Sequence, residues 1–495
     1  MTLPLLTADL VRSAAFQART DVGVPAPGLL ELPERVVQFG TGAFLRGFVE
    51  PLIDQANREG RFGGRVVMVG STGSGRDRVL GEQDGLYTLS VQGVDGGTVV
   101  HERRVIASVS RALSATDEWE AVLACARNPD LALVFSNTTE AGIVLDEGDA
   151  PDAAPPRSFP GKLTRFLWER ATAFDFDPAR GLVVLPCELI EDNGRRLREI
   201  VLAFADRWKL GPRFAAWIEA AVPFRDTLVD RIVPGTPAPD ARGEAEAGLG
   251  YRDALLTVAE AYSLFVIEGD EAMRARLPFG DFPGVVVTDD VAPYRERKVR
   301  LLNGAHTITV PAAVLAGCET VLEAVRHPLV GAFLHRVMLE EIVPTVDAPG
   351  AEGYAHAVLD RFANPHVRHA LLDISLQQTL KVRVRIVPSI LRHAERSGRA
   401  PRCLAFGFAA YLLFVRQCLG LADDQARRVR EHWEHNENGG GQRVAAAVCA
   451  DTELWGADLA AVPGFADTVG EAIDTIARDG IDAALEAHLA AGAAT

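Results

Sequence analysis

The hydrophobic residues of this chain follow two patterns, and the change between them predicts two domains. In the first part, short apolar runs alternate with segments that have helical spacing. These runs predict strands at 35–39, 65–69, 86–91, 131–136 and 181–186, with helices between them such as 43–58 and 117–127. Pro51 is expected to kink or end the first of these helices. Such alternation is typical of a mainly parallel sheet with helices on both faces.

The pattern changes after a last strand-like run at 285–288, beyond which it is helical almost to the end of the chain. We therefore expect an α/β fold, with an N-terminal Rossmann-like dinucleotide-binding domain over residues 1–288 and a mainly α-helical C-terminal domain over residues 289–495. A site in the cleft between two such domains is the default expectation. The segment 236–250 is rich in Pro, Gly and Ala and is interpreted as a loop.

Composition and charge exclude several classes of function. The 495 residues are 48% hydrophobic and 24% charged, as in ordinary globular proteins. The net charge of −16 argues against nucleic acid and against an anionic membrane surface as partners. The N-terminus lacks the basic segment of a secretory signal, and the longest apolar run, 406–415, is too short to cross a bilayer, so we expect a cytoplasmic protein. No His, Cys or Asp cluster has metal-ligand spacing, and we predict no metal site.

A Gly-x-Gly turn follows the first expected strand. The segment Arg35-Val36-Val37-Gln38-Phe39-Gly40-Thr41-Gly42-Ala43-Phe44-Leu45-Arg46 is interpreted as a strand, a tight turn and the start of a helix. Gly40 can adopt backbone angles closed to other residues, and Gly42 allows the close approach of a pyrophosphate. However, Leu45 replaces the usual third glycine and no acidic residue ends the strand at 65–69. The pattern alone fits a purely structural turn equally well.

The segment Lys298-Val299-Arg300-Leu301-Leu302-Asn303-Gly304-Ala305-His306 places a Lys, an Asn and a His at spacings of five and three. On a helix with about 100° per residue, all three share one broad face. A desolvated Lys can act as a base, an Asn amide can stabilise an oxyanion, and a His can hold a hydroxyl. Arg300 is a nearby cation that would favour the neutral, basic form of the lysine. A solvated lysine, an Asn-Gly turn and a packed histidine would give the same pattern.

Basic residues alternate with apolar ones in the segment Lys381–Ile386. If this segment is extended, Lys381, Arg383 and Arg385 lie on one face. A guanidinium can bind a carboxylate through two hydrogen bonds, so this face is a candidate for binding an anionic substrate. A solvated basic strand or helix end is the alternative.

With these motifs in view, the chain resembles the long-chain polyol-specific dehydrogenases, the mannitol dehydrogenase family. Lys298, Asn303 and His306 meet the Lys-x4-Asn-x2-His signature of that family. Further similar blocks lie, in order, at 39–46, 83–88, 135–142, 186–190, 229–232 and 361–365. The resemblance covers nearly the whole chain, and ordered blocks are far more specific than either motif alone.

The resemblance implies metal-independent hydride transfer between a nicotinamide, expected to be NAD, and a carbon of a sugar acid. In that scheme Lys298 is the acid–base group, Asn303 stabilises the oxyanion and His306 positions a neighbouring hydroxyl. Asp230 matches a family position near the substrate, unless it forms a salt bridge with Arg231. The residues expected to bind the cofactor are Phe39, Gly40, Gly42, Ala43, Phe44, Arg46, Asn137 and Thr138.

The sequence departs from the sugar-alcohol members of the family at Leu189, and from some of them at His369. Those members carry Cys-Asp-Asn, whose Asn contributes to the oxyanion hole, and Leu189 stands at that position here. Asn193 is then a candidate second donor, or an ordinary Asn-Gly turn. His369 stands where some members carry Asp, which would suit an anionic substrate, although a surface histidine is equally consistent. Arg76, as a candidate for a 2′-phosphate, keeps NADP open.

The blocks are most similar to the uronate branch of the family, which implies the reversible reduction of D-tagaturonate to D-altronate in hexuronate catabolism. A small sugar acid is therefore the expected partner. Fructuronate reduction, a mannitol or arabinitol dehydrogenase, and a non-catalytic nucleotide-binding sensor remain as alternatives. The sequence does not predict the oligomeric state.

Overall fold

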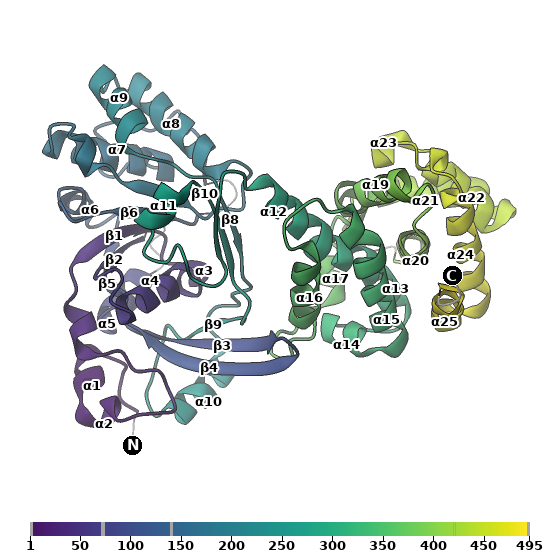
Figure 1. Cartoon of the computed structure of the whole chain (residues 1–495), viewed down its shortest axis with the longest axis horizontal. Coiled ribbons are helices and arrows are strands. Elements are labelled where there is room, and N and C mark those ends of the chain that lie inside the picture. Colours follow the sequence, from purple (N-terminus) through teal and green to yellow (C-terminus); the bar gives the residue numbers. More distant parts are fainter. Residues whose placement is uncertain (1–2, 71–74, 139–141, 419, 421, 493–495) are drawn as a thin grey trace. The chain divides into compact units, whose positions relative to one another are not determined.

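Figure 1 shows the computed structural model of the chain, which describes residues 3–70, 75–138, 142–418, 420 and 422–492. The chain divides into two compact units. Unit 1 comprises residues 1–92 and 100–291, and unit 2 comprises residues 93–99 and 292–495. The predicted fold class is confirmed, because unit 1 holds a parallel sheet with helices and unit 2 is mainly helical.

The central sheet of unit 1 has five parallel strands in the order β5-β2-β1-β6-β7. The strands are β1 (Glu34–Phe39), β2 (Arg65–Gly70), β5 (Val109–Ser114), β6 (Leu133–Ser136) and β7 (Val183–Pro186). Strand β1 lies between β2 and β6, so the strand order reverses at β1. The carboxyl ends of β1 and β6 therefore form the topological switch point, where sheets of this type bind ligands.

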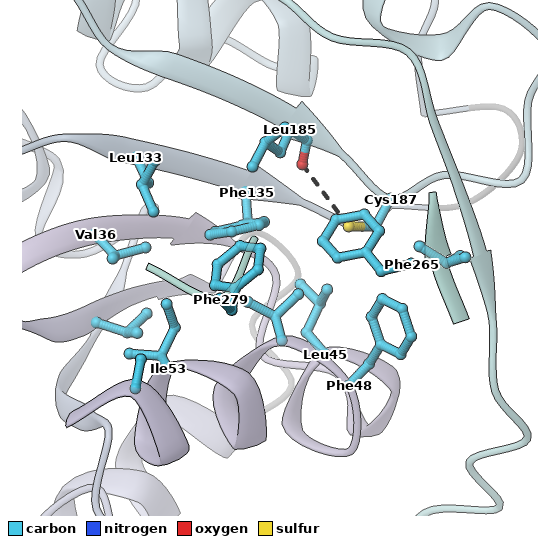
Figure 2. Close-up of a cluster of buried hydrophobic side chains, with 14 of the residues drawn as sticks. Val36, Leu45, Phe48, Ile53, Leu133, Phe135, Leu185, Cys187, Phe265 and Phe279 are labelled. Carbon is cyan, nitrogen blue, oxygen red and sulfur yellow. Dashed lines mark hydrogen bonds between the residues drawn. The ribbon is translucent and has the colours of Figure 1, made fainter. Parts of the chain in front are cut away.

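Successive side chains of β1 and β2 enter two different hydrophobic cores. Val36 and Met68 belong to one core, and Val37 and Val67 belong to the other. Burial on both faces explains why these strands are continuous apolar runs. The helices over one face are α6 (Trp119–Ala126), α7 (Phe159–Ala173), α8 (Asn193–Arg207) and α9 (Pro212–Ala221). Figure 2 shows the core on the other face, where side chains from α3 and α4 meet Phe265 and Phe279.

Six further strands form two smaller sheets. One has the order β11-β10-β8 and the other has the order β4-β3-β9. The strands are β3 (Tyr87–Asp95), β4 (Thr98–Ile106), β8 (Thr227–Asp230), β9 (Thr257–Ala259), β10 (Leu264–Glu268) and β11 (Val285–Thr288). The strand expected at 86–91 thus exists but lies outside the central sheet. Strand β4 was not predicted, because most of its side chains are exposed or half-buried and its sequence carries no apolar periodicity.

Two expectations about helices in unit 1 were wrong. The helix expected at 43–58 is broken into α3 (Ala43–Arg46) and α4 (Val49–Arg58), and Pro51 lies in the first turn of α4, where a missing N–H is tolerated. The loop expected at 236–250 contains α10 (Pro239–Leu249). Pro239 begins that helix and Gly250, with φ of 74°, ends it, so these residues bound a helix rather than mark a loop. The other helices of unit 1 are α1 (Ala8–Arg12), α2 (Ala14–Gln17), α5 (Arg76–Glu82) and α11 (Glu271–Arg276).

Unit 2 is built around α20 (Arg402–Gln417), which is buried from Cys403 to Val415 and contacts α13 and α24. Its helices are α12 (Ala292–Arg297), α13 (Ala305–Leu315), α14 (Val321–Arg326), α15 (Pro328–Arg336), α16 (Ala351–Phe362), α17 (Leu371–Ile374), α18 (Gln378–Lys381), α19 (Val387–Ser397), α21 (Ala426–Asn436), α22 (Gly440–Cys449), α23 (Thr452–Trp455), α24 (Phe465–Asp479) and α25 (Ile481–Gly492). Within the part of the chain that the structure describes, no helix is both long enough and apolar enough to cross a membrane.

Three segments of unit 2 are π-helical: η3 (Lys298–Gly304), η4 (Val337–Ile342) and η6 (Val382–Ile386). A π-helix is rare and is found mostly at functional sites. Segments η3 and η6 contact each other. They contain most of the candidate catalytic and carboxylate-binding residues.

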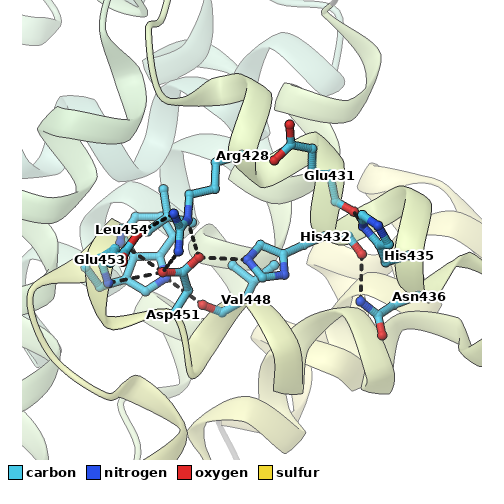
Figure 3. A network of polar contacts seen from close by, with 10 residues as sticks. Arg428, Glu431, His432, His435, Asn436, Val448, Asp451, Glu453 and Leu454 are labelled. Carbon is cyan, nitrogen blue, oxygen red and sulfur yellow. Dashed lines mark hydrogen bonds and ion pairs between the residues drawn. The ribbon is translucent and has the colours of Figure 1, made fainter.

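A polar network ties α21 to the start of α23 (Figure 3). Asp451 accepts the N–H groups of Glu453 and Leu454, and its carboxylate also receives the guanidinium of Arg428 at 2.6 and 2.9 Å and the ring of His432 at 2.8 Å. Burial alone would raise the pKa of Asp451, but the hydrogen bonds from Arg428 and His432 lower it to about 2. The ionised carboxylate therefore stabilises the folded unit.

Replacing Asp451 with Asn should lower the melting temperature at pH 7, because Asn retains the helix cap but loses the charge. The expected loss is on the order of 1 kcal/mol, since Arg428 is half exposed. A folded pKa of about 2 lies below the ordinary 3.8, so the stabilisation is complete above about pH 4 and is lost as the pH falls toward 2. The difference in melting temperature between the wild type and Asp451→Asn should therefore shrink as the pH falls from 7 to 2. Asp424→Asn, at an exposed position, is the control, and an equal effect in both variants would contradict the network.

Candidate active site

The glycine turn after β1 lies at the topological switch point. Gly40 has φ of 125°, and a Cβ atom there would lie 3.0 Å from the carbonyl oxygen of Asn137, so this position requires glycine. Gly42 has an ordinary φ of −66°, and a Cβ atom on it would meet no heavy atom of the described residues within 4 Å. It is the N-cap residue of α3, and because it has no side chain it cannot cap the first N–H groups of that helix. Open space beside uncapped backbone N–H groups fits the pyrophosphate of a dinucleotide.

The loop after β6 forms the other side of the switch point. The amide of Asn137 donates to the carbonyl of Cys187 at 2.7 Å. The backbone and hydroxyl of Thr138 donate to one carboxylate oxygen of Glu188, at 2.9 and 3.1 Å, and the hydroxyl of Ser136 donates to the other. The buried Glu188 therefore fixes the loop beside the glycine turn. The sequence did not predict this role.

The other predicted cofactor residues have structural contacts in this turn. The guanidinium of Arg46 is buried and donates to the carbonyl of Thr41 at 2.6 Å, so it stabilises the turn. The ring of Phe44 stacks on Phe48 with centroids 5.1 Å apart. Phe39 is buried in the core, and Ala43 is the first residue of α3. Arg76 is the first residue of α5 and follows Gly75. Residues 71–74, and residues 139–141 of the family block at 135–142, lie outside the described part of the chain.

A Gly42→Val variant should bind NADH at least about tenfold more weakly, a loss of roughly 1.4 kcal/mol, because its side chain fills the space beside the turn. The variant should fold normally, since no atom of a described residue occupies that space. The matched control is Gly243→Val in α10, where a Cβ atom likewise meets nothing within 4 Å. NADH affinity is measured by calorimetry. Equal affinities in the two variants would place the nucleotide elsewhere.

In unit 2, Lys298, Asn303 and His306 lie on one continuous helical run formed by α12, η3 and α13. Lys298 and Asn303 are the first and sixth residues of the π-helical segment, whose hydrogen bonds join residues five apart. This wider turn places Asn303 about one turn beyond Lys298. Both side chains are partly exposed, and the amide of Asn303 makes no hydrogen bond with any described residue. Asn303 can therefore donate to a substrate oxygen.

Arg385 of η6 lies close to this run. Its guanidinium donates to the hydroxyl of Thr307 at 3.3 Å, and that hydroxyl donates to the backbone carbonyl of Asn303 at 2.7 Å. Arg385 is only partly exposed, and burial lowers its pKa. No carboxylate in the described part of the chain pairs with it. The ammonium of Lys381 donates to the carbonyl of Ile374 at 2.7 Å, and burial and the nearby Arg385 lower its pKa.

The prediction that Lys381, Arg383 and Arg385 share the face of an extended segment was wrong, because the segment is helical from α18 through η6. Residues four apart share a face here: Val382 and Ile386 are buried, whereas Val384 is 50% exposed. Arg383 lies on a different side, where it donates to the carbonyl of Glu453 at 3.4 Å and lies against Gly456. Lys381 and Arg385 therefore remain as the pair near Asn303.

His306 lies in an aromatic and basic environment. Its ring stacks on Phe362 with centroids 3.9 Å apart and meets the ring of His369 edge-on at 5.6 Å. Burial, and then the nearby His369, Arg361, Arg385 and Lys381, lower the pKa of His306 well below its usual value. The ring is therefore neutral at pH 7, and its buried Nε2 atom has no hydrogen-bond partner among the described residues. Phe362 was not predicted as a functional residue, although it lies in one of the family blocks.

The guanidinium of Arg300, the cation expected to influence Lys298, contacts an acidic side chain and a backbone carbonyl. It forms an ion pair with Glu296 at 3.5 Å and donates to the carbonyl of Arg385 at 3.4 Å. This second contact ties η3 to η6.

Two predicted substrate residues, Asn193 and Asp230, lie in unit 1. The amide nitrogen of Asn193 donates to the carbonyls of Pro186, Glu188 and Thr227, at 3.0–3.3 Å, and to the hydroxyl of Thr227. The amide oxygen of Asn193 accepts the backbone N–H groups of Gly194 and Thr227. Both N–H groups of the Asn193 amide are thus used to join β7 to β8, and none is left for a substrate. Asp230 is the last residue of β8 and is buried. The guanidinium of the neighbouring Arg231 donates to the carbonyls of Gly47 and Glu260.

The chain is similar over most of its length to three altronate oxidoreductases. It is 43% identical over 465 residues to an altronate oxidoreductase of Bacillus subtilis (strain 168), covering 93% of this chain and 96% of that protein. It is 42% identical over 468 residues to an altronate oxidoreductase of Cronobacter sakazakii, covering 92% and 96%. It is 40% identical over 464 residues to an altronate oxidoreductase of Escherichia coli (strain K12), covering 91% and 96%.

Two solved structures are similar over almost the whole chain. One is the Pseudomonas fluorescens mannitol 2-dehydrogenase in a ternary complex with NAD and D-mannitol, with 25% identity, a TM-score of 0.66 and coverage of 98% of this chain and 99% of that chain. The other is a D-sorbitol dehydrogenase in substrate-free form, with 25% identity, a TM-score of 0.76 and coverage of 96% and 99%.

The family models cover both units. Residues 34–279 match the mannitol dehydrogenase Rossmann domain, and residues 290–477 match the mannitol dehydrogenase C-terminal domain. The resemblance seen in the sequence blocks is thereby confirmed. The chain belongs to the mannitol dehydrogenase family.

Proposed function

We propose that this protein is an NAD-dependent oxidoreductase that interconverts D-tagaturonate and D-altronate. The observation that carries the proposal is the meeting of two π-helical segments in unit 2. One bears Lys298 and Asn303, and the other bears Arg385, a partly buried guanidinium without a carboxylate partner among the described residues. The identity of 40–43% to altronate oxidoreductases supports the same substrate class.

The acid–base work is assigned to Lys298. In the reductive direction its ammonium donates a proton to the oxygen of the former ketone, and in the oxidative direction its neutral amine takes the hydroxyl proton. Asn303 donates a hydrogen bond to the same oxygen as negative charge develops on it. The neutral His306 can hold an adjacent hydroxyl, since its stacking on Phe362 fixes the plane of its ring.

The substrate carboxylate is assigned to Arg385, with Lys381 beside it. A desolvated guanidinium gains more from a carboxylate than a solvated one does, because it has less water to give up. The hydrogen bond from Arg385 to Thr307, whose hydroxyl is bonded in turn to the backbone of Asn303, fixes the carboxylate site relative to the oxyanion donor. His369 contributes no negative charge to repel the substrate.

The cofactor is assigned to the switch point of unit 1, where Gly40, Gly42 and the loop of Asn137 and Thr138 would hold its phosphates. A bound nicotinamide would supply or accept the hydride. The Pseudomonas fluorescens relative was solved with NAD, which supports NAD as the cofactor here. An NADPH titration beside the NADH titration tests the choice.

The proposal is tested by mixing the purified protein with NADH and D-tagaturonate and identifying the product by NMR. We expect D-altronate, with one NADH oxidised for each molecule formed. The reverse reaction, with D-altronate and NAD, should give NADH. Saturable NADH binding without oxidation in the presence of tagaturonate, fructuronate or fructose would instead support a non-catalytic nucleotide sensor.

A further inference from the structure

A cavity of about 450 Å³ opens in unit 2, and the proposed reaction makes no use of it. Its walls come from α15, η4, α19, the segment between α19 and α20, the start of α20, the start of α24 with the loop before it, and α25. Three arginines from different elements line it, namely Arg336, Arg399 and Arg402. A volume of this order is typical of a site for a small molecule, for which roughly 300–1,000 Å³ is usual.

Two histidines, His393 and His488, line the same cavity. Burial, and then the nearby Arg402 and Arg336, lower the pKa of His488 to about 4. The same ring is held by Phe406, with centroids 4.7 Å apart, and its Nε2 lies 3.5 Å from the sulfur of Cys403. Burial lowers the pKa of His393, and the nearby Arg399 lowers it further. Both rings are therefore neutral at pH 7 and add no positive charge.

The carboxylates of the cavity are already engaged. Glu341 is buried and accepts the backbone N–H groups of Cys403 and Leu404, both at 2.7 Å, and Glu340 lies 3.6 Å from Arg336. Within the described ranges, neither Arg399 nor Arg402 has an ion pair. The cavity is thus locally cationic in a chain whose net charge is −16. Such a reversal of local charge favours an anionic ligand.

We propose that this cavity binds a small organic anion, whose phosphate or carboxylate group is held by Arg399 and Arg402. Both basic groups are arginines, and a guanidinium matches either anion through two parallel hydrogen bonds. The volume exceeds what one phosphate needs, so the ligand has a body, which would lie against small neutral residues such as Ala400, Pro463 and Thr468. The site is distinct from Arg385, which does not line this cavity, and it does not depend on the proposed function.

The test is calorimetric titration with pyrophosphate and with citrate, which separate phosphate from carboxylate chemistry. NADH is present throughout, so that a nucleotide site is filled. The wild-type protein should bind at least one of the two probes saturably. The double variant R399Q/R402Q should bind that probe at least about tenfold more weakly, because it lacks both charge-assisted contacts.

The matched control is Arg427→Gln on α21, whose guanidinium is 86% exposed and pairs with Glu431. It should bind the probe as the wild type does. Melting curves without any probe should show that the double variant is folded. Failure of both probes to bind saturably, or equal affinities in the wild type and the folded double variant, would overturn the proposal.

Discussion

A Lys298→Ala variant should lose roughly 10²- to 10⁴-fold in turnover, which is the usual contribution of a positioned general acid–base group. Lys298 lies in the same π-helical segment as Asn303, and the variant removes the proton donor while leaving the Asn303 amide in place. NADH affinity should be unchanged, because the glycine turn lies in unit 1. Turnover is measured by NADH absorbance with D-tagaturonate, and affinity by calorimetry.

Lys298→Arg is the matched variant that separates proton transfer from charge. Arginine retains the positive charge but does not give up its proton in proteins, so it should be nearly as inactive as alanine. If the arginine variant turned over at close to the wild-type rate, Lys298 would act through its charge alone. If the folded alanine variant did so, Lys298 would have no part in the mechanism.

An Arg385→Met variant should raise the Michaelis constant for D-tagaturonate about tenfold to over one-hundredfold, since a charge-assisted hydrogen bond to a partly buried guanidinium contributes about 1.5–3 kcal/mol. Methionine fills a similar volume without charge. Activity on the uncharged ketose D-fructose, however small, should be unchanged or higher. The quantity to measure is kcat/KM for D-tagaturonate divided by kcat/KM for D-fructose, which should fall in this variant.

Arg383→Met is the control from the same segment. Arg383 lies only two residues before Arg385 in the sequence. Its guanidinium is nevertheless on another side of the helix, where it donates to the carbonyl of Glu453. Its ratio of specificity constants should match that of the wild type. A fall in the ratio for Arg383→Met but not for Arg385→Met would show that the carboxylate is bound elsewhere.

The parts of the site that the sequence predicted are those set by local backbone geometry. Gly40 and Gly42 follow a buried strand directly, and the need for a positive φ and for open space acts over a few residues. The Lys-Asn-His spacing also lies within one helical run. The sequence did not show that this run contains a π-helical turn, which places Asn303 about one turn beyond Lys298.

The errors came where tertiary contacts decide. The alternation in 381–386 fits a strand, but the buried pair Val382 and Ile386 has helical spacing, and only the structure shows which apolar residues are buried. Asn193 is held by Thr227, which lies 34 residues away, so no local pattern could show that its amide is fully used. The same holds for Phe362, whose ring reaches His306 from α16.

The most direct test of the central claim is the specificity constant of the wild-type protein for D-tagaturonate, D-fructuronate and D-fructose, measured in parallel with NADH. If Arg385 and Lys381 receive a uronate carboxylate beside Lys298 and Asn303, D-tagaturonate should have the highest kcat/KM, and uncharged D-fructose should be at least about tenfold poorer. A higher value for D-fructuronate would keep the carboxylate site but change the substrate. A value for D-fructose equal to or above both uronates would contradict the account.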